Sequence, residues 1–441
     1  MFIPNFVLRS SIMKIQRLFF LFLFSFMFFY VTSAQKKITY AEHIQPILRS
    51  HCISCHRPND VAPFSLLSYE DVAPRAGFIE HVTSTKYMPP WRADSSFSHF
   101  KNENLLSEQD VLIIKQWVAD GRTKGKMKKR ASKENAASPE ISASSSESVT
   151  YKRFSMQKPF NIQGDGKEQF RFFHIPFNNP DSQFISSIRF IPGNKKLVHH
   201  SRVMTDTTLA ISGIDGMSAD DTASYAFQSK PLSDPFLFGW VPGNDRIKFP
   251  ANTTKLLYPH TDLLLNIHYA PSPVNDTDSS LVEIGFTKER PEREIQTLTL
   301  TEDYISNKPF LIKANQISKF YMRYDPLQED ISLISIMPHM HLLGKSFRAF
   351  AVTPDGELIK LIHIPRWDFN WQMSYTFKQF VKLPKGTIIY AEGEYDNTIN
   401  NSRNPNHPVK NVGLGWGTKD EMMNLVIYFV PYRLGDENIE L

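Results

Sequence analysis

The two cysteines of this 441-residue chain, Cys52 and Cys55, are separated by only two residues, and the sequence contains no others. No disulfide can therefore join distant segments, although exported proteins commonly use such bonds for stability. The remainder of the chain must be held together by a packed core or by a bound metal.

His56 follows directly and completes the pattern Cys52-Ile-Ser-Cys55-His56. Cys-x-x-Cys-His is the attachment signature of a c-type haem, in which two thioethers hold the cofactor and the histidine supplies an axial ligand. The competing interpretations are a redox-active disulfide, which would need a βαβ context, and half of a zinc site, which would need more Cys or His nearby. We expect haem c, with Met88 as second axial ligand because two prolines restrain the chain after it; the alternative is that Met88 is only a core residue beside Trp91.

The first 34 residues have the order of a secretory signal. Arg9, Lys14 and Arg17 precede the apolar run 18–31, and small residues follow at 32–34. A cleaved signal peptide over 1–34 would make the mature protein periplasmic or secreted; the alternative is a retained anchor, although the run is too short to span a membrane comfortably. Removal of these residues lowers the formal net charge of +5 by three, so nothing in the charge indicates a nucleic-acid partner.

Residues 36–122 are expected to form a small helical domain that ends with a helix over 107–120. Ser107 and Asp110 form a capping box, and Gly121 follows the last turn. The segment from 44 through the haem motif to Trp91 and this helix resembles the monohaem cytochrome c domains that bacteria fuse to exported enzymes. A Ser/Ala-rich stretch without apolar periodicity follows, so residues 123–150 are predicted to be a flexible linker.

Short alternating apolar runs begin after residue 151 and are separated by Pro-Gly and Asp-Gly turn signals. The clearest runs are 170–177, 184–191, 263–269, 331–337, 387–392 and 423–432. Many short strands of this kind are typical of antiparallel sandwiches. The predicted fold is therefore multidomain: a small all-α cytochrome c domain followed by two all-β jelly-roll-like sandwich domains, over residues 151–292 and 293–441.

Five histidines after residue 150 occur in three settings. His199 and His200 are adjacent, His268 ends an apolar run, and His339 and His341 are two residues apart. On a strand, residues i and i+2 point to the same face, so His339 and His341 can converge on one ion. Adjacent histidines diverge on a regular strand, and His199 and His200 would need a bulge or a strand end to share a metal. Each setting alone is weak evidence, because surface histidines often have no function.

The order of these settings is more specific. A His-His pair, then His-Tyr, then His-x-His followed by Leu-Gly, and finally Asp-Glu-Met-x-Asn-Leu at 420–425 all occur in this chain. This order resembles the type II copper, ascorbate-dependent monooxygenases, such as peptidylglycine α-hydroxylating monooxygenase and dopamine β-monooxygenase. The resemblance covers nearly all of residues 155–435.

The resemblance implies two copper ions in two jelly-roll domains that face a solvated cleft. His199, His200 and His268 would bind the copper that stores and passes an electron, and the catalytic copper would be bound by His339, His341 and Met422. Met422 is chosen over Met423 on motif register alone; without the other ligands, Met422 would be taken as a core residue.

Two departures concern the substrate. Where the peptide-amidating enzyme has an arginine two residues before His-x-His, this chain has Met337, and Val426 replaces a tyrosine, although Asn424 matches. A peptide that ends in glycine is therefore not expected as substrate.

The sequence predicts an exported copper monooxygenase that hydroxylates a C–H bond with O₂. Its partners would be O₂, an external electron donor and a small-molecule or peptide-like substrate, with the c-type haem delivering electrons to the copper. The alternatives are a non-catalytic haem-copper protein for electron transfer or sensing, and a β-sandwich binding module with surface histidines.

Overall fold

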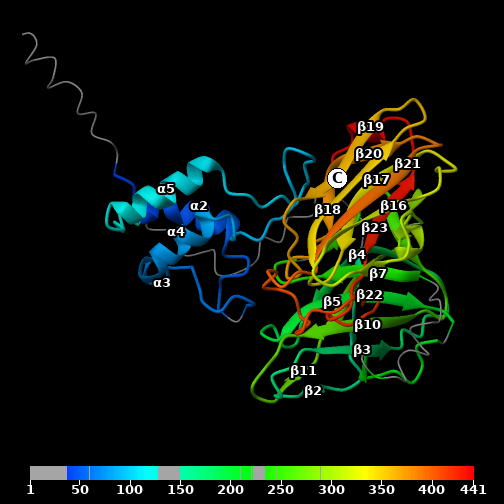
Figure 1. Cartoon of the computed structure of the whole chain (residues 1–441), viewed down its shortest axis with the longest axis horizontal. Helices are drawn as coiled ribbons and strands as arrows, with labels where there is room; N and C mark the ends of the chain where they lie inside the picture. Colours follow the sequence, from blue (N-terminus) through cyan, green and yellow to red (C-terminus); the bar gives the residue numbers. More distant parts are fainter. Residues whose placement is uncertain are drawn as a thin grey trace, which may run out of the picture.

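The computed structural model describes residues 37–58, 60–127, 149–208, 210–219, 221, 234–244, 246–288 and 290–441. The predicted signal peptide, and most of the predicted linker, lie outside these residues. Strands make up 38% and helices 13% of the part that is described, so the protein is predominantly β (Figure 1). No helix in these ranges is both long and apolar enough to cross a membrane.

The N-terminal part consists of short helical elements packed around a small core. Ser107 caps α5 and forms the predicted capping box with Asp110, which confirms that helix. Tyr40, Leu48 and Trp117 are fully buried between the elements. The elements are the π-helix η1 (Tyr40–Ile44), α2 (Gln45–His51), α3 (Tyr69–Val72), the 3-10 helix η2 (Ala73–Arg75), α4 (Ala76–Ser84) and α5 (Glu108–Ala119).

The predicted fold class is wrong. The longest helix, α5, has only 12 residues and α3 has four, and no self-contained all-α cytochrome c domain is evident in the described residues. Trp91, Ala93 and Phe100 leave the helices and pack in the core of the C-terminal strands, where the Phe100 ring centroid lies 5.2 Å from that of Tyr375. Apolar residues that would have closed a helical domain are thus used by the β-structure, and the strands form six sheets rather than two regular jelly-roll sandwiches.

The strands before residue 295 form the first group of sheets. One sheet has the order β1-β12-β4-β9-β13, with β8 on β4; a second has the order β6-β3-β10-β5-β7; β11 and β2 form a small ribbon. A shared apolar core lies between the two larger sheets. The strands are β1 (Thr150–Ser155), β2 (Phe160–Ile162), β3 (Gln169–Ile175), β4 (Gln183–Ile191), β5 (Val198–Asp206), β6 (Met217–Ser218), β7 (Asp234–Trp240), β8 (Ile247–Lys248), β9 (Thr253–Leu257), β10 (Asp262–Tyr269), β11 (Asp276–Asp278), β12 (Leu281–Thr287) and β13 (Arg293–Glu294).

The second group contains the sheets β14-β23-β17-β20 and β16-β21-β18-β19 and the ribbon β15-β22. All six apolar runs predicted to be strands overlap strands of the two groups. The elements are β14 (Gln296–Leu300), η3 (Glu302–Tyr304), β15 (Leu311–Ile312), β16 (Ile317–Arg323), β17 (Ile331–His339), β18 (Gly344–Val352), β19 (Leu358–Ile364), β20 (Tyr375–Leu383), β21 (Ile388–Asp396), β22 (Val412–Gly413), β23 (Asn424–Pro431) and η4 (Asp436–Asn438).

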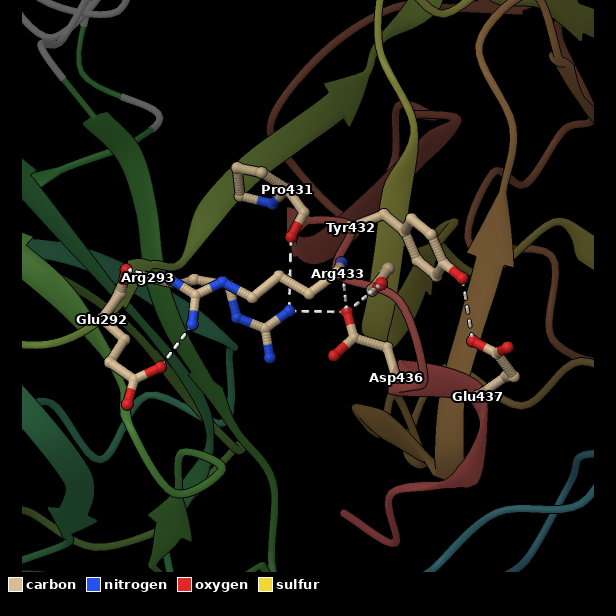
Figure 2. A network of polar contacts seen from close by, with 8 residues as sticks. Glu292, Arg293, Pro431, Tyr432, Arg433, Asp436 and Glu437 are labelled. Carbon is tan, nitrogen blue, oxygen red and sulfur yellow. Dashed lines mark hydrogen bonds and ion pairs between the residues drawn. The ribbon is translucent and has the colours of Figure 1, made fainter.

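The two groups of sheets are joined by an apolar cluster and by a polar network. Phe236 of β7 packs with Met337 and Tyr428 of the second group, and the Tyr428 hydroxyl donates to the Leu237 carbonyl at 2.6 Å. Figure 2 shows the polar network, in which Arg293 pairs with Asp436 at 2.5 Å where the chain crosses between the groups. The apolar cluster and the Tyr428 hydrogen bond hold β7, the edge strand of the β5–β10 sheet, against β17 and β23.

Candidate metal centre

His199 and His200 lie at an irregularity in the pairing of β5 with β10. His268 pairs with His200, but the next residue, Tyr269, pairs with Val198, so that His199 is the extra residue of a bulge. A bulge changes the direction of a side chain that would otherwise point to the opposite face. The structure therefore has the irregularity that two adjacent histidines need in order to converge.

The three imidazoles meet at their Nδ1 atoms. His200 Nδ1 lies 3.2 Å from His199 Nδ1 and 3.3 Å from His268 Nδ1, and one ligand atom from each ring lies within 4.8 Å of the others. Two nitrogens about 2.0 Å from one ion at a tetrahedral angle are about 3.3 Å apart, so the spacing fits a bound metal. Three ring nitrogens at one point cannot all satisfy one another by hydrogen bonds, whereas a cation accepts all three lone pairs.

The surroundings orient these rings and keep those of His199 and His200 uncharged. His199 Nε2 donates to Asn370 Oδ1 at 2.8 Å, and the His268 ring stacks on Phe170 with centroids 4.1 Å apart. Burial, followed by the charge of His268, lowers the pKa of His199 to about 4, and the same causes hold the pKa of His200 well below its usual value. Neutral imidazoles at neutral pH are the form that binds metal.

His339 and His341 lie at the end of β17, with ring centroids 5.0 Å apart. The residue between them, Met340, is fully buried in the C-terminal core, as expected if the two histidines share the other face. His339 Nδ1 bonds to Gln372 Oε1, and His341 Nδ1 donates to the Asp420 carbonyl at 3.0 Å. The lone pair of His339 is then on Nε2, and this atom is buried without a hydrogen-bond partner in the described residues.

Met422 and Met423 lie just before β23. Met423 is fully buried in the C-terminal core, and its sulfur fills the space above Gly393. Met422 does not belong to that core. It lies two residues before Asn424, and Asn424 pairs with His339. The thioether at 422 is thus the one at the strand end that carries the two histidines, although its role as a ligand stays a prediction.

Glu421 connects the two segments that carry these side chains. Its carboxylate accepts the backbone N–H groups of His341 at 2.8 Å, Leu343 at 2.6 Å and Met422 at 3.3 Å. It is fully buried, and burial raises its pKa to about 8 despite these three hydrogen bonds. Because one carboxylate binds the backbone of both segments, Glu421 fixes the position of the turn at His341 relative to Met422.

The loop between β19 and β20 contacts both histidine sets. Asn370 holds His199 and Gln372 holds His339. The Phe369 ring lies between the sets, with its centroid 6.1 Å from His199, 5.6 Å from His200, 6.0 Å from His268 and 5.8 Å from His341. A buried aromatic side chain therefore lies between the two sets, where the sequence predicted a solvated cleft.

The haem motif lies on the helical turn that follows α2. The His56 N–H donates to the Cys52 carbonyl at 3.0 Å, and His56 Nδ1 donates to the Phe64 carbonyl at 3.1 Å. That second bond leaves Nε2 for an axial ligand bond, as haem ligation requires. The thiols are half-buried and unpaired with each other, and burial raises the pKa of Cys52 to about 12. Met88 makes no polar or ring contact with His56 within the described residues, so its ligand role stays a prediction.

Comparisons with known proteins bear on the second histidine set. Residues 313–438 match the C-terminal domain of the copper type II ascorbate-dependent monooxygenases. This region carries His339, His341 and Met422 and supports a copper monooxygenase. An enzyme of this family would use O₂, a substrate and an external reductant such as ascorbate. A comparison with curated proteins finds no match.

Solved structures with partial likeness have unrelated descriptions. A peptide-N(4)-(N-acetyl-β-D-glucosaminyl) asparagine amidase is 10% identical, with 64% of this chain and 96% of that chain covered and a TM-score of 0.30. PNGase F from Flavobacterium meningosepticum is also 10% identical, with 64% of this chain and 95% of that chain covered and a TM-score of 0.29. The major capsid protein P2 of bacteriophage PM2 is 7% identical, with 65% of this chain and 100% of that chain covered and a TM-score of 0.23.

Several residues of the site were not predicted from the sequence: Phe369, Asn370, Gln372 and Arg202. The first three belong to the stretch 367–372, in which polar and aromatic residues alternate. This alternation was the one sequence signal that could have indicated a role for them in the site. Arg202 lies two residues after His200, and its charge lowers the pKa values of His200, His339 and His341 beyond the effects of burial and of neighbouring histidines. It lies on the same face of β5 as His200, beside the three-histidine cluster.

Proposed function

We propose that this protein is an exported copper-dependent monooxygenase that hydroxylates a C–H bond with O₂. The observation that carries the proposal is the convergence of the three Nδ1 atoms of His199, His200 and His268 next to a region that matches a copper monooxygenase domain. The overall reaction takes a C–H bond, O₂, two electrons and two protons to an alcohol and water.

His199, His200 and His268 would hold one copper ion, and His339, His341 and Met422 would hold the second. Copper supplies one-electron chemistry and O₂ activation, and the soft thioether of Met422 favours the cuprous form. The chain's own residues orient these ligands: Asn370, Gln372 and the Asp420 carbonyl fix the ring nitrogens, and Glu421 fixes the His341 turn beside Met422.

We further propose a haem c bound by Cys52, Cys55 and His56, with Met88 as its second axial ligand, as the internal electron donor. A β-carbon on Gly243 would lie 3.0 Å from Cys55 Sγ, so the motif packs against the turn that follows β7. Trp240 of β7 pairs with Ser201, the neighbour of His200. This arrangement supports a short route from the haem site to the three-histidine cluster.

Copper content tests the metal assignment. After reconstitution and desalting, the wild-type chain should hold about two copper ions, and a His199→Ala/His200→Ala variant about one. His363→Ala is the matched control, because His363 pairs with Asp94 away from both sets. O₂ uptake with a panel of C–H substrates then separates an enzyme from a non-catalytic haem-copper protein. Absence of bound copper in the wild type would refute the proposal.

Stopped-flow spectroscopy tests the electron route. The haem, reduced with dithionite, should be reoxidised by O₂ faster in the copper-loaded protein than in the His199→Ala/His200→Ala variant. Equal rates would exclude transfer from haem to copper, and absence of a haem spectrum in the protein expressed with export and haem-attachment machinery would exclude the cofactor itself.

A further inference from the structure

Arg202 and His200 lie two residues apart on β5, so their side chains share one face of the sheet. The register pairs Arg202 with Asn266 in the same way that it pairs His200 with His268. Trp416, from the segment between β22 and β23, covers Arg202 with its ring centroid 4.9 Å from the guanidinium carbon. The cation therefore lies beside the three-histidine cluster, on the side that faces the second group of sheets.

The guanidinium is oriented on one edge, and the other edge has no hydrogen-bond partner among the described residues. Its Nε and Nη2 atoms donate to Asn266 Oδ1 at 3.3 and 3.0 Å. Within the described residues, Nη1 has no hydrogen-bond partner and no carboxylate pairs with the group. Glu168, which lies 3.6 Å from His268, accepts from the Thr418 hydroxyl instead. A planar fork fixed on one edge is suited to grip a carboxylate with the other.

Besides Asn266, the side chains that lie over Arg202 and its β7 partner are apolar. Gly239 pairs with Arg202 on the β7 side, and the space above this glycine is filled by Met337, whose sulfur would lie 2.9 Å from an added β-carbon. Trp416 packs edge-on against Phe172 at 6.1 Å between ring centroids. Apolar walls with a single oriented charge are typical of sites for small organic ligands.

We propose that Arg202 binds the carboxylate of the substrate, and that the substrate is a small organic acid with an apolar body. The role as substrate ligand rests on the proposed function, because Arg202 lies beside His200 on one face of β5 and is covered by Trp416 of the second group of sheets. Binding of a carboxylate at Arg202 does not depend on copper and can be measured without it.

The probe is phenylacetate, titrated by calorimetry into full-length protein freed of metal with a chelator, so that the carboxylate cannot bind copper. Phenylacetamide has the same shape without the charge, and its affinity should be lower than that of phenylacetate by about tenfold or more. Arg202→Gln should weaken phenylacetate binding by about tenfold or more and remove the preference for the acid. Arg202→Lys keeps the charge but loses the planar guanidinium, so its affinity for phenylacetate should lie between those of the wild type and Arg202→Gln.

The matched control is Arg171→Gln. Arg171 lies in the same sheet and also stacks on an aromatic ring, that of Phe160 at 5.3 Å, but it belongs to the opposite face of β3 from Phe172. Its replacement should leave phenylacetate affinity unchanged, and circular dichroism of each variant confirms folding. The inference is overturned if the wild type does not prefer phenylacetate over the amide, or if Arg202→Gln or folded Arg202→Lys keeps wild-type affinity.

Copper content and O₂ uptake measured on the same preparations keep the two proposals apart. Arg202-dependent binding of phenylacetate in a protein that holds no copper would support the anion site and refute the monooxygenase. A copper-loaded protein that consumes O₂ with neutral substrates, and binds phenylacetate equally well without Arg202, would refute the anion site alone.

Discussion

The Nε2 atom of His199 donates to the Oδ1 atom of Asn370, 2.8 Å away, so a residue of the second group of sheets orients a ring of the first. This bond leaves the lone pair of His199 on Nδ1, the atom that faces His200 and His268. Substitution of a residue that orients a metal ligand in this way commonly lowers metal affinity by about 10- to 100-fold.

Asn370→Ala should therefore weaken copper binding at the three-histidine cluster by about 10- to 100-fold, as measured by competition with a chelator of known affinity. Asn102→Ala is the control, because Asn102 bonds to Ser374 near the end of the same loop without touching a histidine. If both variants bind copper like the wild type, the strand bulge alone orients His199.

Replacement of Glu421 should affect the other set. In Glu421→Leu the backbone N–H groups of His341, Leu343 and Met422 lose their shared acceptor. Unpaired buried donors cost about 1–3 kcal/mol each, so unfolding free energy should fall by about 3 kcal/mol or more. Copper content should fall from about two ions to about one, with the loss at His339 and His341. Glu357→Leu, at an exposed position, should change neither quantity.

The ion pair of Asp436 with Arg293 predicts a dependence of stability on pH (Figure 2). Burial raises the pKa of Asp436, but hydrogen bonds from Arg293 and Ser332 outweigh it and hold the pKa below the usual value. The contribution is then fully present above the unfolded pKa of about 3.9 and is lost as the pH falls through the folded pKa.

Asp436→Asn should lower the unfolding free energy at pH 7 by about 3 kcal/mol, because it leaves the largely buried Arg293 unpaired. The difference from the wild type should shrink below pH 4, as measured by urea unfolding at several pH values. Asp303→Asn, at an exposed position, should show no such trend; a difference for Asp436→Asn that stays constant down to pH 3 would contradict the assignment.

Phe100 tests the correction to the fold. It is 1% exposed and packs against Tyr375 and Phe377 of the C-terminal strands. Phe100→Ala should destabilise the β-structure by about 3–5 kcal/mol, whereas Phe78→Ala, at a position 57% exposed on α4, should have little effect. Equal unfolding midpoints for the two variants would mean that the 91–100 segment contributes little to the core.

The local features of this chain follow from its sequence. The capping box of Ser107, the strand runs and the separation of His339 from the buried Met340 depend on contacts between near neighbours, which obey short repeats of two or 3.6 residues. The adjacent histidines at 199 and 200 indicated that a bulge was needed, although not which strand would lie opposite.

The failures arose where distant residues meet. Trp91 and Phe100 have the apolar character of a helical core, and nothing in a periodic pattern shows that their partners are Tyr375 and Phe377. Their burial against β20 is decided by which surface remains uncovered once the sheets have formed, and an all-α domain was predicted in its place.

The sequence by itself determined which chemical groups are available. Its only two cysteines form a haem-attachment signature and leave no cysteine for a disulfide elsewhere, and five histidines occur in three settings. Only the tertiary structure decided that His199, His200 and His268 meet at their Nδ1 atoms, that Phe369 lies between the two sets, and that one edge of Arg202 is left without a hydrogen-bond partner beside them. The reason is physical, because the convergence of side chains depends on strand register and sheet packing, which join residues far apart in the chain.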